Sequence, residues 1–398
     1  MSSHLMAVYN RADVEVDRGE GVWLYSRDGR TFLDCVSGIA TNSLGHAHPA
    51  LVAALHEQAR KLWHVSNIFR IPGQEDLARR LTQNSFADVV FFGNSGSEAV
   101  ECALKTARRY HAVNGSPERI DIVGFAGSFH GRTYATINAS GNPDYLRDFG
   151  PRLPGYEQLR SDDAESIEAA IRRPTTAAVI VEPVQGEGGA RALSEQWLRH
   201  VRRLCTENGV LLIYDEVQSG MGRTGKLFAH QWFEGLAPDI MAVAKALGGG
   251  FPIGACMATA EAAKGMTFGA HGSTFGGNPL AMAVGMAAFD LIAKEETLSN
   301  VLSVSAHLRE GLERLAADYT DIVEDVRGKG MLIGVKLIPN NREMMAMARE
   351  HGLLVAGGGE NCIRLLPPLI MTIEEADEAL LRLGATFAAT RAAAAKVA

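Results

Sequence analysis

Two stretches in the middle of the chain decide the fold: LLIYDEVQSGMGRTG at residues 211–225 and PDIMAVAKALGGGFPIG at residues 238–254. The first starts with apolar, β-favouring residues, and that run ends abruptly in the acidic pair Asp215 and Glu216. This pattern is typical of a buried parallel strand that delivers side chains to a pocket at its carboxyl end. The second stretch places Lys245 between an apolar run and a glycine-rich turn. We therefore predict an α/β fold with a site at these strand ends.

A lone lysine is more often a solvated surface residue than a functional one, but two features favour a functional Lys245. Its apolar flanks would desolvate the amine and lower its pKa toward nucleophilic use. The adjacent glycines 248–250 let the backbone come close to a flat or bulky group. A desolvated lysine and a strand-end carboxylate suit pyridoxal phosphate, because the lysine would bind the aldehyde and the carboxylate would keep the pyridine nitrogen protonated.

Three sequence blocks, DEVQSGMGRTG, AKALGGGFPIG and HGSTFGGNP, resemble the signatures of the class III, ω-amino-group aminotransferases, in the family's order and over nearly the whole chain. The resemblance implies a fold-type-I α/β enzyme with pyridoxal 5′-phosphate, a large domain with a mainly parallel sheet and a small α+β domain. It also implies ping-pong transfer, in which Lys245 holds the cofactor and then acts as general base and acid.

Bulk composition argues against several other classes of protein. The formal charge of −7 leaves no basic surplus for a nucleic-acid partner. Five widely spaced cysteines without a CxxC pair fit free thiols in a reducing cytoplasm. His46 and His48 lack nearby cysteines or carboxylates, so we predict no metal site there. The N-terminal residues lack a signal-peptide core, and the uncharged stretch 265–289 is interrupted by glycines and Pro279. We expect a cytoplasmic enzyme with no membrane partner.

The organisation of the chain predicts three segments. Residues 8–36 are typical of short antiparallel strands with a hairpin at Asp28–Gly29. From Pro49 onward helices and strands alternate, which predicts a mainly parallel sheet with helices on both faces. After Asp290, long amphipathic helices, one opened by a capping box at Thr372, flank short strands. We predict an N-terminal segment 1–45, a large cofactor-binding domain 46–289 and a C-terminal small domain 290–398. The resemblance implies that the first segment joins the small domain.

The NSGSEAV turn, residues 94–100, leads directly into a predicted helix. Its first N–H groups and the helix dipole would form an anion seat, although serine and glycine are also ordinary capping residues. By resemblance, Gly96 and Ser97 hold the cofactor phosphate. Thr274 would reach the phosphate of the neighbouring subunit's cofactor, which implies a homodimer.

Five further residues receive cofactor or substrate roles from the resemblance. Phe129, by itself an ordinary core aromatic, would stack on the pyridine ring. Asp215 would pair with the pyridine nitrogen, and Gln218 would hydrogen-bond the ring oxygen. Arg132 lies in a glycine-rich loop, where its bidentate fork can bind a carboxylate. The resemblance assigns Arg132 to the α-carboxylate of the donor, with Ser273 as a second substrate contact.

Glu187 and Arg364 lie far apart in the sequence, in VEPVQGEGGA and CIRLLPPL. A carboxylate after a buried strand is often only a loop residue that forms local hydrogen bonds. By resemblance the two form a switch in which Arg364 binds the α-carboxylate of glutamate. Glu187 would mask that arginine when the longer donor presents its terminal amine.

The segments GIATNSLGHAHP, KLWHVSNIF and IRLLPPL look closest to the acetylornithine enzymes of the family. The implied reaction converts N-acetylornithine and 2-oxoglutarate into N-acetylglutamate 5-semialdehyde and glutamate, a step of arginine biosynthesis. N-succinylornithine, N-succinyl-diaminopimelate, ornithine and 4-aminobutyrate stay open as donors, because enzymes for all of them share the catalytic blocks. A non-enzymatic phosphate-binding protein that uses only the Gly96–Ser97 turn would require Phe129, Asp215, Lys245 and Arg364 to be incidental.

Overall fold

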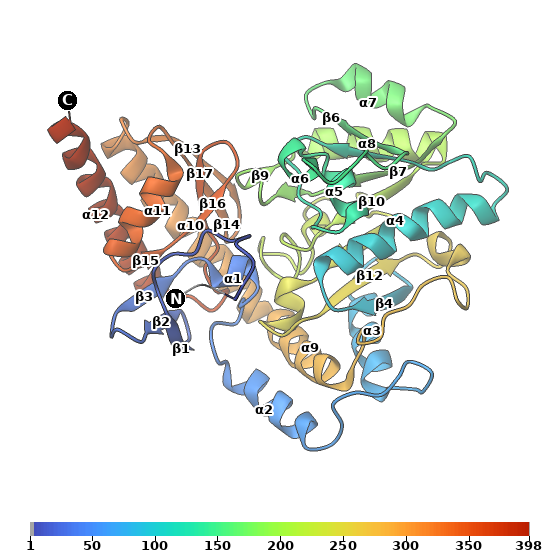
Figure 1. The fold of residues 1–398 in the computed structure, drawn as a ribbon, viewed down its shortest axis with the longest axis horizontal. Helices are drawn as coiled ribbons and strands as arrows, with labels where there is room; N and C mark the ends of the chain where they lie inside the picture. The colour runs from blue at the N-terminus through green and yellow to red at the C-terminus, as the bar shows by residue number, and fades with distance from the viewer. Residues whose placement is uncertain (1–3, 398) are drawn as a thin grey trace.

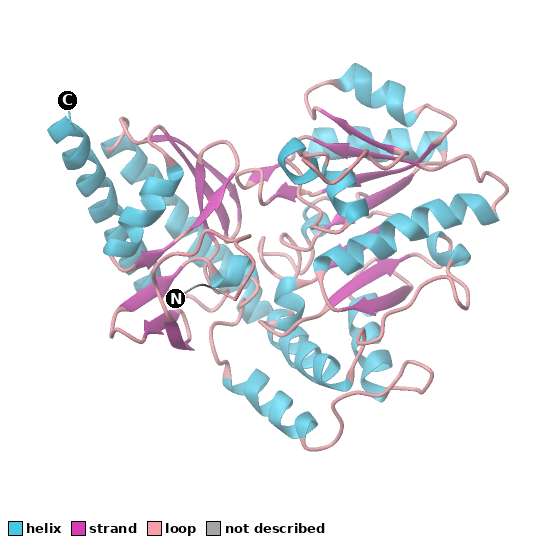
Figure 2. Cartoon of the chain, viewed as in Figure 1, coloured by secondary structure: helices cyan, strands magenta, loops and turns pink. Residues whose placement is uncertain are grey.

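The computed structural model describes residues 4–397 and consists of a larger and a smaller lobe (Figure 1). Both ends of the described chain lie in the smaller lobe, whereas the middle of the chain forms the larger one. In the smaller lobe the C-terminal helices lie on the outer side, away from the larger lobe (Figure 2). Residues 1–3 and 398 of the predicted terminal segments lie outside the described residues.

A seven-stranded sheet forms the centre of the larger lobe. Its strands, in sheet order, are β4 (Val89–Gly93), β12 (Gly254–Ala258), β11 (Ile240–Val243), β10 (Leu211–Asp215), β7 (Thr176–Val181), β5 (Asp121–Phe125) and β6 (Tyr156–Leu159). Neighbours from β11 to β6 pair in parallel, and β12 runs antiparallel to both β11 and β4. The predicted mainly parallel sheet is confirmed. The alternating pattern did not predict β12 or β6, because both are short and lack a run of β-branched residues.

Helices and short strands surround this sheet. The α-helices are α2 (Pro49–Ala59), α3 (Pro72–Gln83), α4 (Gly96–Val113), α5 (Tyr134–Ser140), α6 (Pro143–Leu146), α7 (Ala164–Ile171), α8 (Glu195–Asn208) and α9 (Pro279–Ile292). The shorter elements are the 3₁₀ turns η1 (Ala229–Trp232), η2 (Lys245–Gly248) and η3 (Ala262–Gly265), and the strands β8 (Val184–Gln185) and β9 (Arg191–Ala192).

The central strands are apolar on both faces because helices cover both faces. In β7, Ala178 and Ile180 pack in the buried cluster that includes α4, whereas Val179 and Val181 pack in the cluster that includes α8. This two-sided burial explains why these strands are continuous apolar runs in the sequence. Polar side chains can consequently follow at the carboxyl ends of these strands, where the apolar runs stop.

Local signals set the ends of individual helices. α8 follows Ser194, whose side chain accepts the N–H of Trp197 at 3.2 Å, and it ends at Gly209 with a left-handed φ of 61°. α2 ends at Ala59. The Trp63 indole N–H bonds to the Ala59 carbonyl at 2.7 Å, which satisfies a terminal carbonyl that continued helix would otherwise have paired.

The smaller lobe combines both ends of the chain. One sheet has the order β1 (Val16–Glu20), β2 (Trp23–Ser26), β3 (Thr31–Asp34) and β15 (Leu353–Leu354). The other has the order β13 (Val323–Lys329), β14 (Leu332–Leu337), β17 (Cys362–Leu365) and β16 (Ala356–Gly358). The helices are α1 (Ser37–Ala40), α10 (Glu295–Asp318), α11 (Asn341–Glu350) and α12 (Ile373–Val397).

The pairing of β15 with β3 brings the N-terminal hairpin next to the C-terminal segment. The predicted antiparallel hairpin around residues 27–30 is confirmed by the β2–β3 pair. The predicted capping box is also present, since the Thr372 N–H bonds to Glu375 Oε2 at 2.9 Å and the Glu375 N–H bonds to Thr372 Oγ1 at 3.2 Å. The domain divisions at 45/46 and 289/290 stay a prediction.

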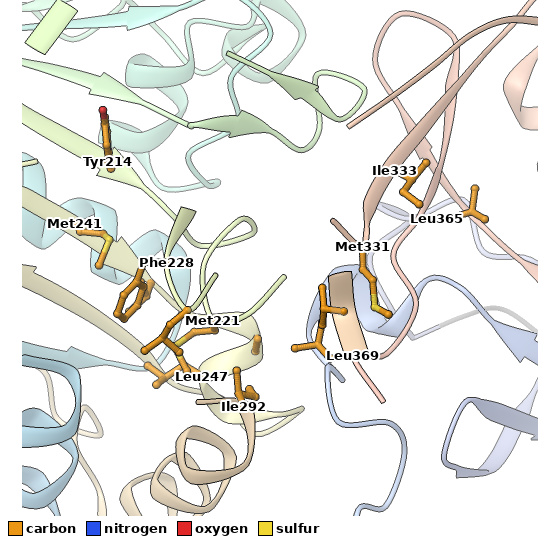
Figure 3. Close-up of a cluster of buried hydrophobic side chains, with 14 of the residues drawn as sticks. Tyr214, Met221, Phe228, Met241, Leu247, Ile292, Met331, Ile333, Leu365 and Leu369 are labelled. Carbon is orange, nitrogen blue, oxygen red and sulfur yellow. The ribbon is translucent and has the colours of Figure 1, made fainter. Parts of the chain in front are cut away.

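One buried hydrophobic cluster crosses between the lobes. Figure 3 shows it extending from Tyr214 and Met241 in the larger lobe to Ile333 and Leu365 in the smaller lobe. A shared core of this kind restricts the relative movement of the two lobes. The shape of any cavity between the lobes therefore depends on this packing.

Several sequence features have plain structural outcomes. All five cysteines are free and buried. His46 Nε2 lies 2.8 Å from Asp34 Oδ2, and among residues 4–397 no group of three or more His, Cys, Asp or Glu is placed to hold a metal ion. Over the same residues, no helix is both long and apolar enough to cross a membrane.

Candidate active site

A cavity of about 330 Å³ lies at the carboxyl ends of the central strands. Seven of the predicted site residues line it: Gly96, Ser97, Phe129, Glu187, Asp215, Gln218 and Lys245. The parallel register explains this convergence, because β10 ends at Asp215 while its neighbours β7 and β11 lead directly to Glu182 and Lys245. A cavity therefore lies where the sequence predicts the site, while the roles of its residues stay a prediction.

Asp215 is almost fully buried, at 3% exposure, and both of its carboxyl oxygens have hydrogen-bond partners. Its Oδ1 accepts the N–H of Val217 at 3.0 Å, and its Oδ2 lies 2.8 Å from Nδ1 of His130. His130 is also buried, and its Nε2 has no hydrogen-bond partner among the described residues. A carboxyl group fixed by an imidazole and a backbone N–H keeps a defined orientation in the cavity.

Lys245 is half-buried and begins η2 immediately after β11 and Ala244. Burial lowers the pKa of its amine to about 8, against the opposing effect of the Glu187 carboxylate. Its backbone has a φ of 49°, in the left-handed region that few residues other than glycine adopt. Strained backbone of this kind is common at functional sites, where the surrounding packing maintains it.

The amino end of α4 forms one wall of the cavity. Ser95 caps the helix by accepting the Glu98 N–H at 3.2 Å. Gly96 packs so closely on Val217 that a β-carbon there would lie 2.7 Å from its Cγ1. Ser97 Oγ accepts the backbone N–H of Arg132 at 3.3 Å. The unpaired N–H groups of this first turn therefore face the cavity and favour an anion.

Phe129 and Arg132 belong to the loop that follows β5. The Phe129 ring lies edge-on to Tyr145, with centroids 5.8 Å apart. The Arg132 guanidinium lies 3.7 Å from the Tyr145 centroid and is otherwise exposed, outside the residues that line the 330 Å³ cavity. An aromatic face that holds the cation leaves its N–H groups free to bind a carboxylate.

Glu187 and Arg364 are brought together by the fold. Arg364 Nη2 lies 2.8 Å from Glu187 Oε1, although the arginine is only 1% exposed. Its Nη1 also donates to Gln218 Oε1 at 3.1 Å, and its Nε donates to the Gly357 carbonyl at 2.9 Å. The predicted pair thus exists as an ion pair at the cavity, while its function as a switch stays a prediction.

Ser273 and Thr274 lie apart from this cavity in the described chain. Both line a different hollow, next to His271 on the outer side of α4. Ser273 Oγ accepts from Asn94 Nδ2 at 3.2 Å and from the Gly276 N–H at 3.0 Å, whereas Thr274 is exposed. Neither residue therefore reaches the 330 Å³ cavity of its own chain.

Sequence reasoning assigned no role to two buried residues of the cavity, His130 and Glu182. His130 stands directly beside Phe129, and Glu182 directly follows the buried strand β7. A polar residue at the end of an apolar strand was a usable signal for Glu182. For His130 no local signal existed, because its contact with Asp215 depends on the order of strands in the sheet.

Similarity to known proteins agrees with this geometry. A family model described as aminotransferase class-III matches residues 6–387. The chain is 68% identical to acetylornithine aminotransferase 2 of Caulobacter vibrioides over 98% of this chain and 97% of that protein. Among solved structures it resembles the ornithine aminotransferase from Toxoplasma gondii ME49, with a TM-score of 0.93 and 32% identity over 98% of this chain and 93% of that one. It also resembles the N-acetylornithine aminotransferase from Stenotrophomonas maltophilia K279a, with a TM-score of 0.85 and 39% identity over 97% and 98% of the two chains. The protein therefore belongs to the class III aminotransferases and is a pyridoxal-phosphate-dependent transaminase of fold type I.

Proposed function

We propose that this enzyme transfers the terminal amino group of N-acetylornithine to 2-oxoglutarate, which yields N-acetylglutamate 5-semialdehyde and glutamate in arginine biosynthesis. The observation that carries the choice of donor is the full-length similarity, at 68% identity, to a relative named acetylornithine aminotransferase 2. Because this transfer requires only metabolites of the cell interior, we also propose a cytoplasmic location.

The residues of the cavity fit pyridoxal phosphate. The N–H groups at Gly96 and Ser97 would hold the phosphate, since the start of α4 favours an anion. Phe129 would stack on the pyridine ring, and Asp215, oriented by His130, would pair with the ring nitrogen. Gln218 would hydrogen-bond the ring oxygen. When bound, the cofactor supplies an aldehyde for amine exchange and a ring that accepts electrons.

Lys245 is the residue that would hold the cofactor covalently and then transfer protons. Its Nζ would act as general base and general acid for the proton on the amine-bearing carbon of the donor. The lowered pKa, about 8, makes a fraction of neutral amine available near neutral pH. The buried walls of the site exclude water that would compete for this proton.

Arg132 and the Glu187–Arg364 pair would select the substrates. Arg132 would bind the α-carboxylate of the donor, with Ser273 of the partner subunit as a second contact, and N-acetylornithine would leave the Glu187–Arg364 pair closed. The shorter 2-oxoglutarate would place its α-carboxylate on Arg364, so that Glu187 must move away. The 2.8 Å ion pair supports this order, because Glu187 is only half-buried and can move away while Arg364, 1% exposed, stays anchored by Gly357.

We further propose a homodimer in which Thr274 binds the cofactor phosphate of the partner. Two segments, 62–69 and 266–276, form an apolar patch, and Asn67 Nδ2 links them by donating to the carbonyl of Ser273 at 3.1 Å. The exposed apolar side chains of this patch are Leu62, Trp63, Ile68, Phe69, Phe268 and Phe275. Contiguous apolar surface of this kind favours a protein–protein interface.

The test is a donor panel measured with 2-oxoglutarate, comparing kcat/KM for N-acetylornithine, N-succinylornithine, N-succinyl-diaminopimelate, ornithine and 4-aminobutyrate. We expect N-acetylornithine to lead. A lead for another donor would overturn the substrate assignment and leave the transaminase chemistry intact. Formation of N-acetylglutamate 5-semialdehyde should be stoichiometric with glutamate, as the transfer requires.

A further inference from the structure

Glu182 is a buried carboxyl group for which neither the reaction nor the substrates require a direct role. It follows β7 and lies beside Asp215, whose strand β10 is the neighbour of β7 in the sheet. No arginine or lysine of residues 4–397 forms an ion pair with it. A carboxyl group buried without a cation is costly, so its presence here calls for a structural reason.

The two carboxyl oxygens of Glu182 bind two separate segments. Oε1 accepts the backbone N–H of Phe129 at 2.7 Å, and Oε2 accepts the backbone N–H of Gly186 at 3.1 Å. The first segment carries the ring that lines the cavity, and the second carries Glu187, which pairs with Arg364. Glu182 therefore connects the cofactor side of the cavity to the substrate side.

The two segments also pack tightly against their surroundings. A β-carbon on Gly186 would lie 2.0 Å from Gln218 Oε1, and one on Gly188 would lie 2.5 Å from the Gly127 carbonyl. Gln185 Nε2 adds a bond to the Ala126 carbonyl at 2.9 Å. With so little free space, a small displacement of either segment moves the other.

We propose that Glu182 is a positioning residue that fixes Phe129 and the Glu187 turn as one unit through its two carboxyl oxygens. The importance of this positioning for the reaction rests on the proposed function of Phe129 and Glu187. The two hydrogen bonds of Glu182 do not depend on that function. A carboxyl group suits this role because it presents two acceptors about 2.2 Å apart, whereas an amide presents one acceptor and one donor. Burial and the Asp215 charge raise the pKa of Glu182 to about 7, and His130 opposes that rise.

The variant that tests the contact is Glu182→Gln, which keeps the size and turns an NH₂ group toward one of the two backbone N–H groups. Glu216→Gln is the matched control. Glu216 is also buried at the end of β10 and also accepts two backbone N–H groups, from Ala229 at 2.5 Å and His230 at 2.9 Å, but it does not line the cavity. In each variant one of the two backbone N–H groups faces an NH₂ group in place of its acceptor, and Glu216→Gln also changes the 3.0 Å contact of Glu216 with His230 Nδ1.

The measurement is amide hydrogen exchange of the cofactor-free protein, followed by fragmentation mass spectrometry. In Glu182→Gln the amides of Phe129 and Gly186 should exchange about tenfold faster or more, as expected for loss of about 1.4 kcal/mol of protection. Glu216→Gln should leave these two amides unchanged and accelerate those of Ala229 and His230. Equal acceleration of Phe129 and Gly186 in both variants, or none in Glu182→Gln, would overturn the proposal.

A wild-type measurement covers the case in which Glu182→Gln does not fold. The amides of Phe129 and Gly186 should then show equal protection across a denaturant series, because one carboxyl group holds both. Different protection would overturn the proposal. Where the variant folds, kcat/KM should fall through a higher KM for 2-oxoglutarate more than through kcat. Because hydrogen exchange in the cofactor-free protein is independent of the donor, its result is separable from the outcome of the donor panel.

Discussion

The strand-end cavity and the loop 266–276 differ in how far one chain completes them. At the strand ends, Asp215 is 3% exposed and each of its oxygens has a partner. In the loop, Phe275 is 58% exposed and Thr274 lies on the surface, away from the cavity of its own chain. Contacts within one chain therefore hold Asp215 in place. The loop instead exposes apolar side chains, as protein–protein interfaces do before they associate. Substitutions in the two regions should therefore differ in both size and kind of effect.

The largest effect is expected for Lys245→Ala. It removes both the group that would hold the cofactor and the base that would move the proton, so kcat should fall by at least about 10³-fold. Steady-state turnover of N-acetylornithine measures it, with Lys264→Ala as a control, because Lys264 is exposed and far from the cavity. Near-normal turnover by Lys245→Ala would refute the assigned role.

Asp215→Asn should be the next most severe. Asparagine preserves the size and a contact with His130 but removes the charge that would stabilise the protonated ring nitrogen, and kcat should fall by about 10²- to 10³-fold. Absorbance of the reconstituted protein tests whether the cofactor still binds. A kcat within about threefold of the wild-type value would contradict the proposed pairing.

The pH dependence of cofactor attachment should show the burial of Lys245. Its pKa is lowered from 10.5 to about 8, so the neutral amine gains population as pH rises through about 8. The rate of attachment to cofactor-free protein should rise about tenfold from pH 7 to pH 9. The sign for stability follows, since the folded chain disfavours the charged amine: the contribution of Lys245 to the free energy of unfolding should increase between about pH 8 and 10.5. A rise of about a hundredfold over pH 7–9, as for an amine that keeps the usual pKa of 10.5, would contradict the lowered pKa.

Glu187→Gln should change specificity more than rate. Without the carboxylate, Arg364 stays open to an α-carboxylate, so the kcat/KM ratio of N-acetylornithine to glutamate should fall by about tenfold. The two half-reactions, measured separately, give this ratio. An unchanged ratio would show that the 2.8 Å ion pair is only structural.

The smallest effect is expected for Thr274→Ala, with about a two- to tenfold loss of cofactor affinity from one hydrogen bond. Mixed dimers sharpen this test. When Thr274→Ala and Lys245→Ala subunits are combined, the site that retains its lysine receives an intact Thr274 from its partner. That site should regain wild-type affinity for the cofactor, and failure to regain it would contradict the exchange of Thr274 across the interface.

Much of the larger lobe was predictable because its signals are local. Apolar runs that end in charged residues predicted β7, β10 and β11 and placed Asp215 and Lys245 at strand ends. β12 and β15 were harder to predict from the sequence. β12 is rich in small residues, and β15 has two residues and is defined only by its pairing with β3. Family motifs supplied Gln218 and Arg364, whose contacts no periodicity indicates.

The sequence by itself determined the fold class, the order of elements and the residues that meet at the strand ends, since burial pattern and strand direction follow from the local arrangement of apolar residues. Only the tertiary structure decided that His130 supports Asp215 and that Glu182 binds two segments. These contacts join residues distant in the chain through the order of strands and the packing of the two lobes. Local propensity carries no information about that order. The hydrogen-bond partners of these residues can therefore be identified only from the folded structure.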